Sequence, residues 1–119
     1  MFASLKHVLR VHRHRARDAV SGRKRIIAVL EQLKASHELL SVSVAGCQTA
    51  ATSAILSVSD DRNCFMLDEL SVPELHRRFL EQRKAVVRGR LHGMELRFAC
   101  RLLSAGTEGG IGLYEVAIP

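Results

Sequence analysis

The chain has 119 residues and a formal net charge of +6, with 47% hydrophobic and 4% aromatic residues. This length fits one domain that can bury a core without disulfides or metals. No apolar run approaches the roughly 20 residues of a membrane-spanning helix, and basic residues from Lys6 onward exclude a secretory signal peptide.

The basic residues are concentrated at the N-terminus. Residues 6–25 contain eight basic residues against Asp18 alone, whereas the rest of the chain has ten basic and eleven acidic residues. Residues 1–22 are therefore interpreted as a basic leader, helical over 3–17 or disordered, which could contact an acidic protein, an anionic membrane or RNA. A solvated, frayed terminus is the other interpretation. The candidate interaction or anion-binding patch is Arg10, Arg13, Arg15, Arg17, Arg23, Lys24 and Arg25.

Residues 23–36 form the clearest predicted helix. An apolar stripe at helical spacing, suited to packing on a sheet, consists of Ile26, Ile27, Leu30 and Leu33. Ser21-Gly22 is predicted to separate this helix from the leader. The chain is thus expected to divide into a leader over 1–22 and a domain over 23–119.

Apolar and polar residues alternate after this helix, as they do in half-buried strands. Strands are predicted over 39–46, 50–59, 65–67, 85–91, 94–103 and 111–118. Polar turns at 60–63 and 92–93 join neighbouring strands into hairpins, and residues 104–110 are predicted to form a flexible loop. A short helix is predicted over 73–82, with Leu75, Phe79 and Leu80 packed on the domain.

The alternation is cleanest over 94–103, where one face is apolar and the other is charged. The apolar face consists of Met94, Leu96, Phe98, Cys100 and Leu102. A shift of one residue would bury the charges, so this strand fixes its own register. We therefore predict a mainly β fold with an N-terminal helix, namely a small antiparallel six-stranded split β-barrel.

The sequence contains no motif that is typical of a catalytic site. Asp60-Asp61 and Asp68-Glu69 are adjacent pairs whose side chains would point to opposite faces, so they make poor acid–base pairs. Phosphate-binding and nucleophile motifs are missing, and the six histidines show no spacing typical of a metal site. Three widely spaced cysteines indicate reduced, small buried side chains. No catalytic, cofactor-binding or metal site is predicted, and the chain is not expected to be an enzyme.

Several short motifs follow one another in a fixed order along residues 23–119. They are Ile26-Ile27-x-x-Leu30-x-x-Leu33, Leu39-Leu40-x-Val42, Thr52-Ser53-Ala54-Ile55-Leu56-x-Val58, Leu67-Asp68-Glu69-Leu70, Gly89-Arg90-Leu91-x-Gly93-Met94-Glu95-Leu96-Arg97-Phe98 and Gly112-Leu113-Tyr114-Glu115-Val116-x-Ile118-Pro119. In this order they resemble the N-terminal (PilZN, YcgR-like) domain of bacterial flagellar brake proteins. The resemblance implies a six-stranded split barrel in the bacterial cytoplasm.

Full-length members of that family continue into a linker and a PilZ domain. These supply the RxxxR and D/N-x-S-x-x-G motifs that bind cyclic di-GMP, and the sequence stops before them. Arg13-x-x-x-Arg17 has the first spacing but lies upstream of the barrel, and the second motif does not follow it. No cofactor is therefore expected, and cyclic di-GMP is expected only if a partner PilZ domain supplies the binding motifs.

The resemblance implies a stand-alone, non-enzymatic signalling or interaction module of the cyclic di-GMP and flagellar motility system. It would act through contacts with a PilZ-domain protein or a flagellar motor component, and a homo-oligomer is left open. The alternative is a small nucleic-acid-binding β-barrel that uses the basic leader, but Phe65, Phe98 and Tyr114 all fall on apolar faces and offer no stacking platform. A flavin-binding enzyme subunit on a split barrel is a third hypothesis, without a phosphate-binding set to support it.

Overall fold

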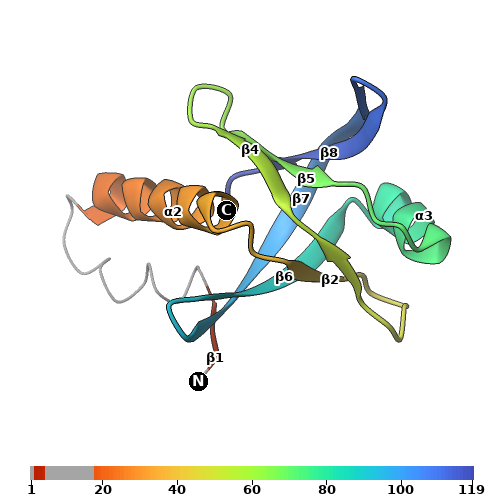
Figure 1. Ribbon diagram of the computed structural model, residues 1–119, viewed down its shortest axis with the longest axis horizontal. Coiled ribbons are helices and arrows are strands. Elements are labelled where there is room, and N and C mark those ends of the chain that lie inside the picture. The colour runs from red at the N-terminus through yellow and green to blue at the C-terminus, as the bar shows by residue number, and fades with distance from the viewer. Residues whose placement is uncertain (1, 5–17) are drawn as a thin grey trace.

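Two helices lie at opposite ends of a curled antiparallel sheet (Figure 1). The computed structural model describes residues 2–4 and 18–119. Seven strands are hydrogen-bonded in the order β3-β2-β6-β7-β8-β5-β4, and β1 adds a parallel strand beside β7. The elements are β1 (Phe2–Ser4), α2 (Asp18–Ala35), β2 (Leu40–Ser43), β3 (Ala51–Ser53), β4 (Ile55–Ser59), β5 (Cys64–Asp68), α3 (Pro73–Gln82), β6 (Lys84–Leu91), β7 (Met94–Glu108) and β8 (Ile111–Ala117).

Helix α2 buries three residues of the predicted apolar stripe and leaves Ile27 partly buried, but it begins earlier than predicted. It starts at Asp18 rather than at residue 23, so Ser21 and Gly22 lie inside the helix instead of ending the leader. Gly22 is buried four residues before Ile26, on the same helix face. The position is buried, and tertiary packing overrides the poor helix propensity of glycine there.

Most of the predicted leader lies outside the described residues. The helix predicted over 3–17 is wrong at Ala3 and Ser4, which belong to strand β1 and pair with Leu96 and Arg97 of β7. This pairing satisfies backbone groups on an edge of β7 that would otherwise have no strand partner. Residues 5–17, where the rest of that helix was predicted, are outside the described part.

The strand predicted over 50–59 is divided at Ala54 into β3 and β4. The buried Ser53 hydroxyl donates to the carbonyl oxygen of Asp68 at 2.7 Å, and the Asp68 N–H donates to the Ala54 carbonyl at 3.0 Å. Strand β3 pairs with β2, whereas β4 pairs with β5. The predicted six-stranded split barrel is therefore corrected to a curled half-barrel of seven antiparallel strands, with β3 and β4 at the two ends of the strand order.

Strand β7 extends through both parts of the sheet. It pairs with β6 over 94–101 and with β8 over 102–108, with a register shift between Leu102 and Ser104. The loop predicted over 104–110 is wrong for its first five residues, because these pair with β8. Only Gly109 and Gly110 make the turn, at φ values of 58° and 82° that favour glycine.

The core lies inside the curled sheet, between α2 and α3. The predicted apolar face of β7 is buried from Leu96 to Leu102, whereas Met94 at the hairpin end is 50% exposed. Helix α3 has the predicted bounds, and its Leu75 and Phe79 are buried. Leu80, which was predicted to pack with them, is 39% exposed.

Close packing between β6 and β2 gives a test of this core. A Cβ atom at Gly89 would lie 2.6 Å from Cδ2 of the buried Leu40. We expect Gly89→Ala to lower the free energy of unfolding by about 1–3 kcal/mol through overpacking, as measured by urea denaturation. Gly106→Ala in β7 is the control, because nothing lies within 4 Å of its Cβ position. Equal stabilities of the two variants would contradict the packing described.

Candidate functional site

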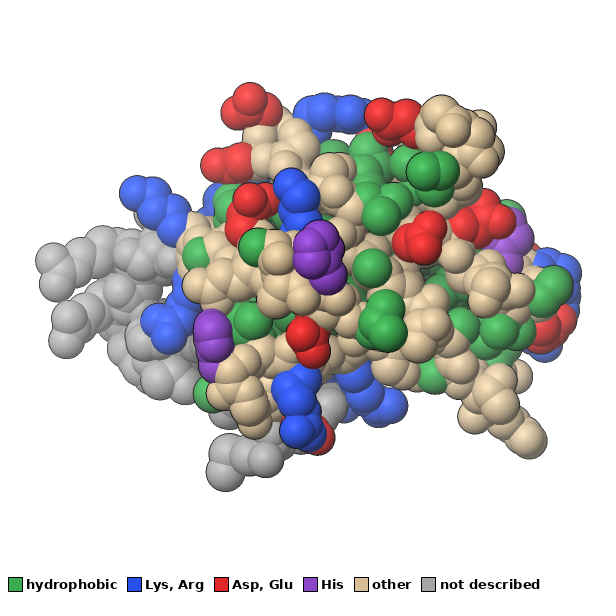
Figure 2. All heavy atoms as spheres, in the orientation of Figure 1, with side chains coloured by type: hydrophobic (Ala, Val, Ile, Leu, Met, Phe, Trp, Pro, Cys, Tyr) green, Lys and Arg blue, Asp and Glu red, His purple; other side chains and the backbone are tan. Residues whose placement is uncertain are grey.

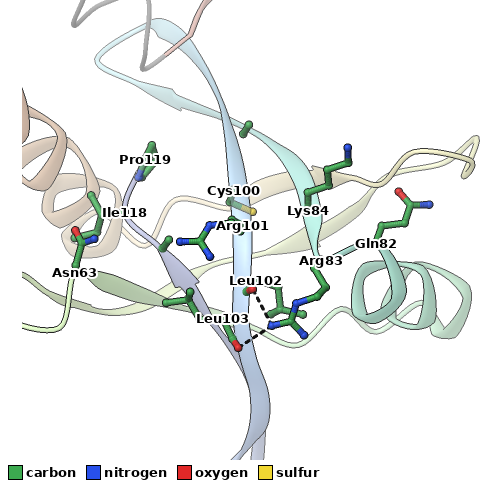
Figure 3. A pocket seen from close by; sticks show the side chains of 12 residues that line it. Asn63, Gln82, Arg83, Lys84, Cys100, Arg101, Leu102, Leu103, Ile118 and Pro119 are labelled. Carbon is green, nitrogen blue, oxygen red and sulfur yellow. Dashed lines mark hydrogen bonds between the residues drawn. The ribbon is translucent and has the colours of Figure 1, made fainter.

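A groove opens between strand β7 and the last residues of the chain (Figure 3). It forms where β8 separates from β7, since these strands pair only from Leu102 onward. Lys84 and Arg101, which face each other on β6 and β7, are exposed at the groove. The volume is about 700 Å³, and the lining comes from Asn63 and residues 82–84, 99–103 and 117–119.

Arg83 fixes one wall of the groove at the junction of α3 and β6. Its backbone is left-handed, with φ of 61°, and its N–H donates to the Phe79 carbonyl at 2.8 Å, which ends α3. Its guanidinium donates to the carbonyl oxygens of Leu102 at 3.1 Å and Leu103 at 2.9 Å, drawn as dashed lines in Figure 3. These carbonyls lie at the register shift of β7, so Arg83 satisfies groups at this irregularity.

The groove has the chemistry of a binding surface. Cys100 is buried beside it, and burial raises the pKa of the thiol to about 12. Because the thiolate is the reactive form of cysteine, this side chain is inert at neutral pH. Within the described residues, no group of three or more His, Cys, Asp or Glu side chains could hold a metal ion. The exposed cations Lys84 and Arg101 instead attract negatively charged groups.

The Leu67-Asp68-Glu69-Leu70 motif leads into a buried hydrogen-bond centre at Tyr114. The Tyr114 hydroxyl accepts from the Leu70 N–H at 3.1 Å and hydrogen-bonds to Nδ1 of His76 on α3 at 2.6 Å. Its ring meets Phe79 edge to face, with centroids 4.8 Å apart. Burial raises the pKa of the Tyr114 phenol above its ordinary value of 10.0, so the hydroxyl stays neutral at neutral pH. This centre is structural, and Asp68 ends strand β5 as predicted.

The predicted basic patch is not brought together within the described residues, because Arg10, Arg13, Arg15 and Arg17 lie outside them. Arg23 is directed towards the β4–β5 turn, where its guanidinium donates to Oδ1 of Asn63 at 2.6 Å and to Oδ1 of Asp60 at 2.8 Å. Lys24 and Arg25 are exposed on α2. Arg23 thus ties the helix to the sheet, and the rest of the patch stays a prediction.

The groove residues were not predicted from the sequence, although one feature of the sequence indicated where two of them lie. A two-residue turn at 92–93 sets the register of the β6–β7 hairpin, and this register places Lys84 opposite Arg101. The roles of Arg83 and Asn63 carry no comparable signal, because both depend on contacts with distant strands. The Ile118 N–H, for example, donates to the Asn63 carbonyl at 3.1 Å.

The fold defines the class of this protein as a small, mainly β domain with two helices. It is similar to the YcgR-N domain of YcgR from Escherichia coli, with a TM-score of 0.71 and 18% identity over 82% of this chain and 84% of that chain. It matches YcgR from Escherichia coli in complex with c-di-GMP with the same score and identity, over 82% of this chain and 41% of that chain.

A family model described as flagellar regulator YcgR, PilZN domain, matches residues 19–119. The chain therefore belongs to the PilZN family, which confirms the resemblance drawn from its motifs. It is also 24% identical over 102 residues to the flagellar brake protein YcgR of Thioalkalivibrio sulfidiphilus, which covers 86% of this chain and 42% of that protein. The chain thus spans about two fifths of the curated relative. None of its described helices is both long and apolar enough to span a membrane.

Arg83 provides a test of how the groove is built. Arg83→Ala removes both guanidinium hydrogen bonds to the β7 carbonyls, and we expect it to lower the free energy of unfolding by about 1–2 kcal/mol. Arg101→Ala is the matched control, because Arg101 is exposed in the same groove; its effect should stay within about 0.5 kcal/mol. Chemical denaturation measures both variants, and a control at least as destabilised as Arg83→Ala would show that the Arg83 contacts do not support the groove.

Proposed function

We propose that this domain is a non-enzymatic signalling module of the cyclic di-GMP and flagellar motility system, acting through contacts with other proteins. The observation that carries the proposal is the match to the PilZN domain of flagellar regulator YcgR across residues 19–119. One relative is a flagellar brake protein, and the YcgR of Escherichia coli forms a complex with c-di-GMP. We place the domain in the bacterial cytoplasm, with a PilZ-domain protein or a flagellar motor component as its partner.

The chemistry of the groove supports binding rather than catalysis. Its cysteine is held in the neutral form by burial, and its arginine at position 83 is engaged with backbone carbonyls. Two exposed cations there, Lys84 and Arg101, are suited to ion pairing with a partner.

Binding of cyclic di-GMP is proposed to depend on a partner domain. The 119 residues contain no D/N-x-S-x-x-G motif. The RxxxR spacing occurs at Arg13 and Arg17 and again at Arg97 and Arg101, but the second pair lies on β7 within the sheet. Side chains four residues apart on a strand are separated by about 13 Å, so Arg97 and Arg101 are not a preformed phosphate clamp.

Calorimetric titration of cyclic di-GMP tests this proposal. We expect no heat of binding from the chain alone, and binding when a PilZ-domain protein from the same organism is present. Titration of that partner without the chain is the control, and the chain should change its affinity or enthalpy for the nucleotide. Micromolar binding by the isolated chain would contradict the dependence on a partner, and an unchanged partner titration would contradict the proposed pairing.

A further inference from the structure

Charged side chains are segregated between the two parts of the sheet. Residues 83–103, which form β6 and the first part of β7, contain six basic residues and one acidic residue. Segments 54–72 and 104–119, which contain β4, β5 and β8, together contain six acidic residues and one basic residue. Figure 2 shows several acidic side chains along the top of the molecule and basic side chains projecting from its lower edge. The near-neutral charge of residues outside the N-terminal segment therefore hides two oppositely charged parts.

The outer side of β6 and β7 presents its cations in facing positions. From one end to the other, the facing pairs on this side are Lys84/Arg101, Val86/Ala99, Arg88/Arg97 and Arg90/Glu95. Strand β2 places Ser41 and Ser43 beside them. We call this surface the basic face, and its cations are Lys84, Arg88, Arg90, Arg97 and Arg101, all of them exposed.

Two of the facing pairs set like charges against each other. Facing side chains in antiparallel strands have Cβ atoms about 4.5–5.5 Å apart, where like charges are destabilising. The Arg90 guanidinium instead donates to Glu95 at 2.8 Å. No ion pair joins Lys84 or Arg101 to an acidic side chain within residues 22–119. A bound anionic group would supply the negative charge that this pair lacks.

The composition of the basic face indicates that its partner is a protein. Four of its five cations are arginines, whose planar guanidinium matches a carboxylate in two hydrogen bonds. Val86 and Ala99 lie between the charged pairs, and Leu39, which is 71% exposed, lies beside Arg90. Arginine mixed with apolar contacts is typical of protein interfaces. Single-stranded nucleic acid needs exposed aromatic rings, yet every Phe and Tyr side chain within residues 22–119 is at most 1% exposed.

We propose that the basic face binds an acidic protein surface, through arginine–carboxylate pairs placed around Val86, Ala99 and Leu39. The inference rests on the proposed function, because it specifies the chemistry of a protein partner. The face is about 20 Å long, from six steps of about 3.3 Å along β6. With a width of two strands spaced about 4.8 Å apart, its area is about a few hundred Å² at most, less than the roughly 800 Å² per partner of a standard interface. The contact is therefore weak, transient and sensitive to salt.

Fluorescence anisotropy with a labelled poly-glutamate peptide, at low and high sodium chloride, tests the basic face. The double variant Lys84→Glu/Arg101→Glu should weaken binding of the peptide at least about tenfold. The control is Lys34→Glu on the exposed side of α2, outside the predicted basic patch, and it changes the net charge as much as the single variant Lys84→Glu. It should weaken binding less than about twofold, because rim and remote charges contribute little to affinity.

The single variant Lys84→Glu separates binding from folding. It converts the like-charged pair with Arg101 into a pair of opposite sign, so the Tm of the free domain should rise by a few degrees while affinity for the peptide falls. A general loss of structure would lower both quantities. A fall in Tm together with unchanged peptide binding would overturn the proposal.

Other results would also overturn the proposal. Equal weakening by the α2 control variant would show that only net charge matters. Tighter binding at the same salt to a single-stranded oligonucleotide, to phosphatidylserine vesicles or to a second copy of the chain would show a different occupant. If the proposed function is wrong, the chain will not change the titration of the PilZ-domain protein with cyclic di-GMP, and the peptide measurements will be unaffected. If only the basic face is wrong, the chain will still change that titration, but the peptide will not bind as described.

Discussion

The hydrogen bonds of the Tyr114 hydroxyl join three elements that are distant in sequence, and the rest of the domain is arranged around them. Strand β8 carries the tyrosine, the Leu70 N–H follows β5, and His76 belongs to α3. A buried hydroxyl without partners would cost about 1–3 kcal/mol, so these elements are fixed relative to one another. The edge-to-face contact with Phe79 holds α3 on the same tyrosine ring.

The position of α3 in turn determines the groove. The helix ends at Arg83, whose left-handed backbone turns the chain into β6 and whose guanidinium reaches the β7 carbonyls. On the other side, the β4–β5 turn is held by Arg23 from α2 and by the Ile118 N–H near the end of the chain. The groove lies between these two sets of contacts, so its shape follows from the packing of both helices.

Local patterns were sufficient to predict most strands and helix α3, because alternation and turn residues are properties of short segments. The break at Ala54 was not predictable, since it depends on a hydrogen bond from Ser53 to Asp68 across the sheet. Residues 104–108 lack an apolar alternation and become a strand only by pairing with β8. The helix start was missed because Gly22, an expected breaker, is accommodated as a buried residue on the inner face of α2.

Prediction of the site was limited by the same dependence on distant contacts. Counting charges along the sequence located the basic N-terminal segment. The strand order then shows that β6 and the first part of β7 form a basic part of the sheet, separate from the acidic β4, β5 and β8. Arg23, predicted as part of an interaction patch, is used within the domain. Family membership, by contrast, was predicted from the order of weak motifs, because the spacing of the motifs follows the order of the helices and strands along the chain.

The proposed role in motility is tested most directly by the swimming speed of tracked cells of the source organism with raised cyclic di-GMP. Cells without the gene should swim at a different speed from the parent strain. The wild-type gene should restore the parental speed, whereas the folded Lys84→Glu/Arg101→Glu variant should not. Identical speeds of the deletion strain and the parent strain would contradict a function in flagellar regulation.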